Sequence, residues 1–228
     1  MNGFNSSPII MGDGLRKYMT SIYNRMFLAL CLTAIVSMIC ASNPQILAFM
    51  AGGFSILLMI ATFGIVIYLS ARINHMPSEK ANGLFWIYSA LLGAFLSPLF
   101  AIYTGESIAN SFVMTAMFFG GMSLYGYVTK RDLTGVGSFM TVGLFAVIIS
   151  SIVNLFLKSS GLQIGLSALC IVIFSGLTAY DIQKIKTFYN ASADEETLKK
   201  RAILGSLTLY LDFINLFLSI LRFFGDRR

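Results

Sequence analysis

Seven apolar stretches, each about as long as a lipid bilayer is thick, occupy most of this 228-residue sequence. A helix needs about 20 apolar residues to cross a hydrocarbon core of about 30 Å. Helices suit that environment because they satisfy their own backbone hydrogen bonds where water is absent. The stretches are residues 26–41, 46–71, 81–103, 107–128, 136–157, 162–180 and 202–224. The sequence therefore predicts an all-α integral membrane protein with seven transmembrane helices.

The composition excludes an ordinary soluble domain. Hydrophobic residues make up 57% of the chain and charged residues 11%, whereas soluble domains carry about 25% charged residues. The net charge of +6 does not indicate a nucleic-acid partner, because the basic residues lie between the apolar stretches rather than on one soluble face. The lipid bilayer is the surrounding that this composition predicts.

Lys and Arg are distributed unevenly between the two sides of the predicted membrane. We expect a polar cytoplasmic tail over residues 1–25, a transmembrane domain over 26–224 and a short tail over 225–228. The first apolar stretch has the length of a signal peptide, but the long polar segment before it favours a retained helix. With the amino terminus inside, twelve of the 16 basic residues are cytoplasmic and four are not, which is the usual bias. We expect the last helix to cross fully, with a re-entrant helix as the alternative.

Asp212 lies near the middle of the last apolar stretch. A carboxylate at the centre of a bilayer costs about 2.5–3.5 kcal/mol on insertion scales, so such residues usually face a cavity or a partner. Thr208, Asp212, Asn215 and Ser219 follow one another at steps of four, three and four residues, which places them on one face of a helix. We expect this polar stripe to face a bundle interior or an aqueous path.

A second carboxylate, Asp181, closes the sixth apolar stretch. If the sixth helix continues about two turns beyond Asp181, its carboxylate reaches the depth of Asp212 and the two groups meet. Two close carboxylates in a low dielectric share a proton and titrate as a unit, which makes a pH sensor. When ionised, they offer hard oxygen ligands suited to Ca²⁺. Two carboxylates are too few for a tight calcium site, but conduction requires weak, transient binding.

Two further charged residues are candidates at the ends of the path. Arg72, at the cytoplasmic end of the second helix, is the basic residue that we expect to latch the aspartate pair. It is equally compatible with a flanking side chain that extends to the headgroup region. Glu106 follows the third helix and is a candidate cation-attracting group at the outer mouth, with a solvated turn residue as the alternative. A purely structural role in the bundle is the alternative for both aspartates.

No motif in the sequence indicates an enzyme or a resident cofactor. HExxH, GxSxG and Walker A patterns are missing, and the three cysteines lack CxxC spacing. Paired intramembrane aspartates also occur in aspartyl intramembrane proteases, but the glycine-aspartate context of those enzymes is missing here. We therefore predict no catalytic residues and no cofactor, with calcium as a permeant or regulatory ion.

Three motifs resemble those of the Bax inhibitor family, the transmembrane Bax inhibitor motif proteins. They are YLDFINLF at residues 210–217, GLTAYD at 176–181 and SLYGY at 123–127 followed by TKRDL at 129–133. The likeness runs from about Arg16 to the carboxyl terminus and is closest in character to the bacterial YccA-like branch. This resemblance implies a bacterial inner membrane, six helices around a central seventh, and a pH-sensitive calcium leak gated by an aspartate dyad. Carried over, the dyad would be Asp181 and Asp212 and the latch Arg72.

Three hypotheses for function follow. The first is a passive calcium leak gated by pH at the aspartate pair. The second is a non-conducting membrane partner that modulates another membrane protein, such as a quality-control protease. A proton-coupled transporter is the third, but the sequence shows no inverted repeat, and Pro98 alone interrupts a span in the way that a broken helix requires.

Overall fold

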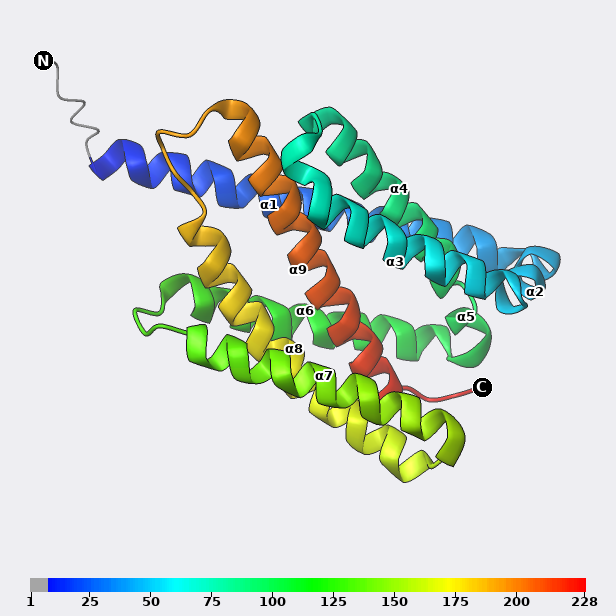
Figure 1. Cartoon of the computed structure of the whole chain (residues 1–228). Helices are drawn as coiled ribbons and strands as arrows, with labels where there is room; N and C mark the ends of the chain where they lie inside the picture. The colour runs from blue at the N-terminus through cyan, green and yellow to red at the C-terminus, as the bar shows by residue number, and fades with distance from the viewer. Residues whose placement is uncertain (1–7) are drawn as a thin grey trace, which may run out of the picture. The chain divides into compact units, whose positions relative to one another are not determined.

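The computed structural model describes residues 8–228, and the chain there is almost entirely helical (Figure 1). Within these residues the only extended pairing is an isolated bridge between Tyr103 and Arg227. A short 3₁₀ turn, η1 (Ile73–His75), follows α3. The helices are α1 (Pro8–Ser42), α2 (Pro44–Ala51), α3 (Phe54–Arg72), α4 (Ser78–Leu96), α5 (Leu99–Ile102), α6 (Gly105–Val128), α7 (Thr134–Leu157), α8 (Ser160–Thr187) and α9 (Glu195–Phe224).

Among the described residues, seven helical segments are long and apolar enough to cross a membrane, which confirms the predicted class. They are Gly12–Ser42, Phe54–His75, Ser78–Ile102, Gly105–Val128, Thr134–Leu157, Ser160–Thr187 and Glu195–Phe224.

The ends of the helices differ from the ends of the apolar stretches. Of the predicted amino-terminal tail 1–25, residues 1–7 lie outside the described residues, and the rest belongs to α1. The predicted span 46–71 is divided into α2 and α3, because Asn43 caps α2 through Gln45 N and the chain turns at Gly52 and Gly53. A hydropathy pattern identifies the apolar centre of a helix but does not show where the helix begins and ends at polar turns.

The chain forms two compact units. The first contains α1 to α4 together with residues 185–207, and the second contains residues 98–184 and 208–228. Both α8 and α9 therefore contribute one part to each unit. The two aspartates, the polar stripe and Glu106 belong to the second unit, whereas Arg72 belongs to the first.

In the first unit, α4 packs against α1 and α3, which lie beside it in Figure 1. A Cβ at Gly93 of α4 would meet the backbone of Thr33 in α1, so glycine permits this close approach. The Thr33 hydroxyl donates to the carbonyl oxygen of Ser89 at 2.9 Å and reinforces the contact. At the start of α4, the Glu196 carboxylate accepts from the Ser78 backbone N–H at 2.7 Å. This contact fastens the first turn of α9 to a helix whose own cap residue, Pro77, makes no side-chain cap.

In the second unit, α8 packs closely on α6 and α7. A Cβ at Gly126 of α6 would meet the backbone of Ala179, and one at Gly137 of α7 would meet the ring of Tyr180. The side chain of Gln183 fixes the loop between α6 and α7, since its amide accepts from Leu133 N and donates to Arg131 O, both at 2.8 Å. These contacts hold the part of α8 that carries Asp181.

Helix α9 is the most deeply buried span. In its most apolar segment 72% of the residues are buried, against 44% or less in the other six spans. Phe213 of α9 packs on Phe112 and Phe119 of α6, with ring centroids 5.3 and 5.4 Å apart. Such burial leaves little lipid-facing surface for the polar stripe.

The carboxyl terminus is held at the turn that joins α5 to α6. Arg228 N donates to Ile102 O at 2.9 Å, and Asp226 N donates to the Ser107 hydroxyl at 2.9 Å. Arg227 also lies 5.9 Å from the centroid of the Tyr103 ring. The terminus therefore lies at the same membrane face as this turn, which follows the third span. These contacts support a complete crossing by α9 over a re-entrant helix.

Candidate ion site on helices α8 and α9

Asp212 is the buried carboxylate of the second unit. It lies in the middle of α9, and only 5% of its surface is exposed. Asp181 lies on α8 and is half-buried. The two side chains are within hydrogen-bonding reach of each other. The structure therefore brings together the two aspartates that the sequence singled out.

The meeting depends on α8 continuing past the end of the apolar stretch. Hydropathy falls after Tyr180, but α8 runs on to Thr187. Ile182 and Ile185 are both buried, at 0% and 3% exposure, so this last part of the helix keeps one apolar face although it is polar on the other. That spacing of isoleucines was the signal in the sequence for a longer helix.

The second unit contains buried polar atoms that lack hydrogen-bond partners. Asp212 Oδ2 is buried and accepts no hydrogen bond, and the buried hydroxyls of Ser123 on α6 and Ser175 on α8 also have no partner. Buried polar atoms are normally satisfied by protein, water or an ion, so each such atom requires an explanation. For the carboxylates, a proton shared between the two groups is one physical answer and a cation is the other.

Lys184 is the cationic side chain that the structure places near Asp181. It lies one helical turn beyond Asp181, interacts with it electrostatically, and its Nζ is 5.7 Å from the centroid of the Tyr180 ring. Lys184 lies outside the predicted sixth span, which ends at residue 180. The i, i+3 spacing of Asp181 and Lys184 predicts that the two side chains are neighbours, but only if α8 continues as a helix beyond residue 180.

The other predicted site residues have more ordinary surroundings. Arg72 ends α3 in the first unit and is exposed. Glu106 is exposed in the first turn of α6, where an acidic side chain complements the helix dipole, and Thr104 caps that helix. The functional roles proposed for both residues remain predictions.

The polar stripe on α9 presents oxygen acceptors. Asn215 Nδ2 donates to Leu211 O at 2.8 Å, and the Ser219 hydroxyl donates to Asn215 O at 2.6 Å. Thr208 and Asn215 are half-buried and Ser219 is buried. Because the donors are turned toward the backbone, the amide oxygen of Asn215 and the lone pairs of Ser219 are left to accept from water or to face a cation.

The aspartate pair is not part of a closed metal centre. In the part of the chain that the structure describes, no group of three or more His, Cys, Asp or Glu side chains is placed to hold a metal ion. A hard cation at the pair would have two carboxylates and otherwise water or neutral oxygens as ligands. Oxygen ligands of this kind suit hard cations.

Comparison with known proteins places this architecture in a family. Residues 15–228 match the family described as "Inhibitor of apoptosis-promoting Bax1". The chain is 46% identical to the inner membrane protein YbhL of Escherichia coli strain K12 over 219 residues, which covers 94% of each protein. It is 48% identical to protein RP147 of Rickettsia prowazekii over 217 residues, covering 95% of this chain and 92% of that protein. The chain therefore belongs to the Bax inhibitor family.

Proposed function

We propose that this protein is a passive, pH-sensitive calcium leak of the bacterial inner membrane, gated by Asp181 and Asp212. The observation that carries the proposal is the direct interaction of two carboxyl groups from neighbouring spans, one of them buried deep in α9. The name of the Escherichia coli relative supports the inner-membrane location. In this proposal the two carboxyl groups bind and release protons and cations but form no covalent bond with a substrate, and no enzymatic activity is proposed.

The gate works through charge. When both carboxyl groups are ionised, they repel each other and attract cations, so Lys184, Ca²⁺ and the proposed latch Arg72 compete for them. Protonation neutralises the pair and releases Arg72 from it. We therefore expect the path to open on acidification, although protons also displace Ca²⁺ from its ligands.

The stripe on α9 supplies the rest of the proposed path. Thr208, Asn215 and Ser219 continue the line of Asp212 along one helix face and offer neutral oxygens that replace water around a passing cation. Glu106 is the proposed attracting group at the outer mouth. The partnerless hydroxyls of Ser123 and Ser175 support a hydrated interior in the second unit.

The deciding experiment is Ca²⁺ flux into proteoliposomes as pH is lowered from about 8 to about 5. We expect the wild type to leak more Ca²⁺ toward acidic pH, and we expect Asp212→Asn and Asp181→Asn to abolish that response. Asp132→Asn is the matched control, since it removes an exposed carboxylate of the same unit and is expected to behave as wild type. Arg72→Gln is expected to raise the leak at neutral pH.

The result that contradicts the proposal is equally clear. A wild-type protein that is tight to Ca²⁺ at every pH, or an Asp212→Asn variant with unchanged pH-dependent flux, rejects the gate. The aspartates then become structural groups, and the modulation of another membrane protein becomes the function to test, by deleting residues 1–15 and measuring partner binding.

A further inference from the structure

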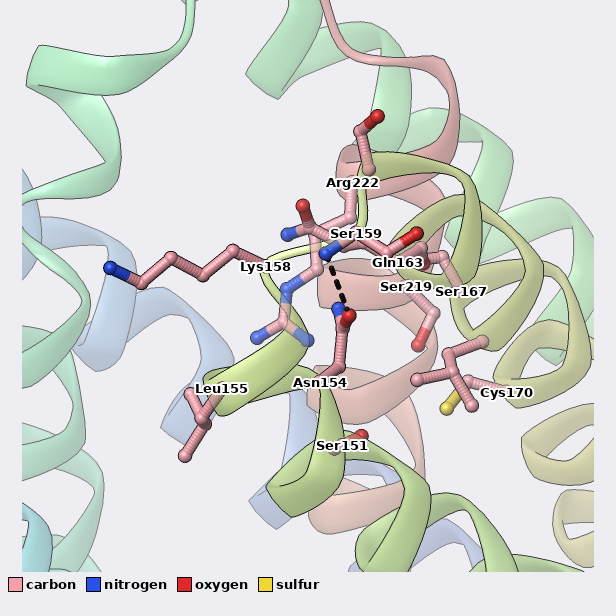
Figure 2. A pocket seen from close by; sticks show the side chains of 12 residues that line it. Ser151, Asn154, Leu155, Lys158, Ser159, Gln163, Ser167, Cys170, Ser219 and Arg222 are labelled. Atoms are coloured by element: carbon pink, nitrogen blue, oxygen red, sulfur yellow. Dashed lines mark hydrogen bonds between the residues drawn. The ribbon is translucent and has the colours of Figure 1, made fainter.

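A pocket of about 610 Å³ opens in the second unit where α7 ends and α8 begins, against the last turns of α9 (Figure 2). The residues that matter most in its lining are Asn154, Lys158, Ser160, Gln163, Ser219 and Arg222. Nine of the twelve lining residues have polar or basic side chains, and their apolar atoms together with Leu155 and Leu166 form much of the lining surface. A pocket of this size accommodates the polar part of a small molecule or a lipid.

The charged side chains that line this pocket are all basic. Its lining contains two cations, Lys158 and Arg222, and no Asp or Glu. They come from different helices, one from the end of α7 and one from the last turns of α9, so tertiary folding brings them to one cavity. Two uncompensated cations around a cavity at the end of membrane spans create a site that attracts an anion.

Hydrogen-bond donors accompany the two cations. Asn154 Oδ1 accepts from Ser159 N at 3.0 Å, as the dashed line in Figure 2 shows, which leaves the amide nitrogen of Asn154 as a donor. Ser160 begins α8, and the N–H groups of this first turn that do not bond to Ser159 have no intrahelical partner, whereas Gln163 N donates to Ser159 O at 3.1 Å. The pocket thus offers donors of three kinds, guanidinium, side-chain amide and backbone, while the hydroxyls of Ser167 and Ser219 already donate to backbone carbonyls.

Lys158 holds an unusual backbone conformation at the rim of this pocket. Its φ is 50°, the only positive φ of a non-glycine residue in the described chain, and its N–H closes α7 by donating to Asn154 O at 2.8 Å. Figure 2 shows its side chain extending away from the serines, on the side opposite Ser167 and Cys170. The flexible stem of a lysine at a rim lets its ammonium group swing toward a ligand.

The surroundings indicate where the anion comes from. Phe156 is 83% exposed, and Leu155 and Phe224 are also largely exposed next to the pocket in sequence. In a membrane protein, exposed apolar residues at the end of the spans face acyl chains, so the pocket lies at the level of the lipid headgroups. A phosphate there carries the charge and the multiple acceptor oxygens that Arg222 and the amide donors match.

We propose that this pocket binds a phosphate group, supplied by the headgroup of an anionic phospholipid whose chains lie against the exposed apolar side chains. The site does not include the aspartate pair, although it shares Ser219 with the polar stripe of α9, and phosphate binding there is measured without calcium flux.

The test compares three probes on purified protein in detergent. They are dioctanoyl phosphatidylglycerol, dioctanoylglycerol, which has the same chains and no phosphate, and inorganic phosphate. We expect phosphatidylglycerol to raise the thermal stability of the wild type at saturable concentrations and dioctanoylglycerol to have no such effect. An equal effect of inorganic phosphate assigns the site to the free anion instead, and an equal effect of dioctanoylglycerol overturns the proposal.

The variants test the residues. Lys158→Asn with Arg222→Gln removes both cations, and asparagine tolerates the left-handed backbone of position 158. We expect the apparent Kd for phosphatidylglycerol to weaken at least about tenfold. Lys130→Gln with Arg131→Gln removes the same charge from an exposed loop of the same unit and is expected to bind as wild type. Unchanged affinity in the first double variant overturns the proposal.

A second measurement leaves both cations in place. Cys170 lines the pocket beside Ser219. In a Cys31→Ala, Cys40→Ala background it is the only cysteine. We expect phosphatidylglycerol to slow alkylation of Cys170 by iodoacetamide several-fold, and dioctanoylglycerol to leave the rate unchanged. An alkylation rate that does not respond to phosphatidylglycerol or inorganic phosphate contradicts the site.

Discussion

Gly137 shows how a single residue positions the aspartate pair. It lies on α7, where a Cβ would occupy the space of the Tyr180 ring, and Tyr180 directly precedes Asp181. Without a side chain at position 137, α7 and α8 approach closely, and the turn of α8 that carries Asp181 is held in place. Close contacts at small residues are a main source of helix association in lipid.

Gly137→Ala is expected to destabilise the protein by about 1–3 kcal/mol, because the added methyl group forces Tyr180 and its helix to move. Gly135→Ala is the matched control on the same helix, since a Cβ there meets nothing within 4 Å. Thermal unfolding in detergent measures both variants. Equal melting temperatures for the two variants would show that the Tyr180 contact is not tight.

The sequence indicates those residues whose burial in a membrane is energetically costly. Asp212 is conspicuous in an apolar helix, and its burial follows from that placement. The proximity of Lys184 to Asp181 is not evident from the sequence, because a lysine just beyond an apolar stretch usually extends into solvent. The sequence also gives no sign that the hydroxyls of Ser123 and Ser175 lack hydrogen-bond partners, since a serine in a span usually bonds to its own helix.

The helices extend beyond their apolar centres, and the chain between α8 and α9 is correspondingly short. Asp194 immediately precedes α9, and its carboxylate accepts from Thr197 N at 2.7 Å and from the Thr197 hydroxyl at 2.8 Å. The backbone hydrogen bond, followed by the hydroxyl, holds the pKa of Asp194 below its ordinary value. The charged segment 181–201 therefore contains two helix ends, which hydropathy and charge alone do not distinguish from a loop.

A depressed pKa in the folded state means that the ionised Asp194 stabilises the protein above the unfolded pKa. This contribution begins to fall as pH drops below the unfolded pKa of about 4, and it is gone only below the lower, folded pKa. Asp194→Asn keeps a good cap without a titrating group. We expect the wild type to melt higher than this variant near neutral pH and the difference to vanish in acid. Asp226→Asn, exposed at the carboxyl end, serves as the control, and a difference independent of pH would contradict the cap.

At the scale of the whole molecule, the hydropathy pattern predicted the number of spans but not the division into two units. That division arises from side-chain packing between segments far apart in the chain, such as Ser78 with Glu196 and Gly126 with Ala179. Neither contact has a periodic signature in the sequence. The membership of Arg72 in the first unit likewise follows from packing and not from its flanking position.

The distribution of Lys and Arg predicts which face of the molecule is cytoplasmic. In a protein without its native cysteines, Lys158→Cys is expected to react with a membrane-impermeant maleimide in intact spheroplasts, because it joins α7 to α8 on the outer face. Arg131→Cys, in the loop between α6 and α7, is expected to react only after permeabilisation. The opposite pattern of labelling would invert the orientation.

The bonds that hold the last residues to the α5–α6 turn matter to anyone who handles the protein. An affinity tag or a fluorescent reporter fused after Arg228 begins beside Ile102 and Ser107. Its first residues therefore compete with the hydrogen bonds of Asp226 to Ser107 and of Arg228 to Ile102. A short tag placed there is partly shielded from a capture resin, and a large one pulls on the end of the most buried helix. A fusion at the amino terminus disturbs none of these bonds.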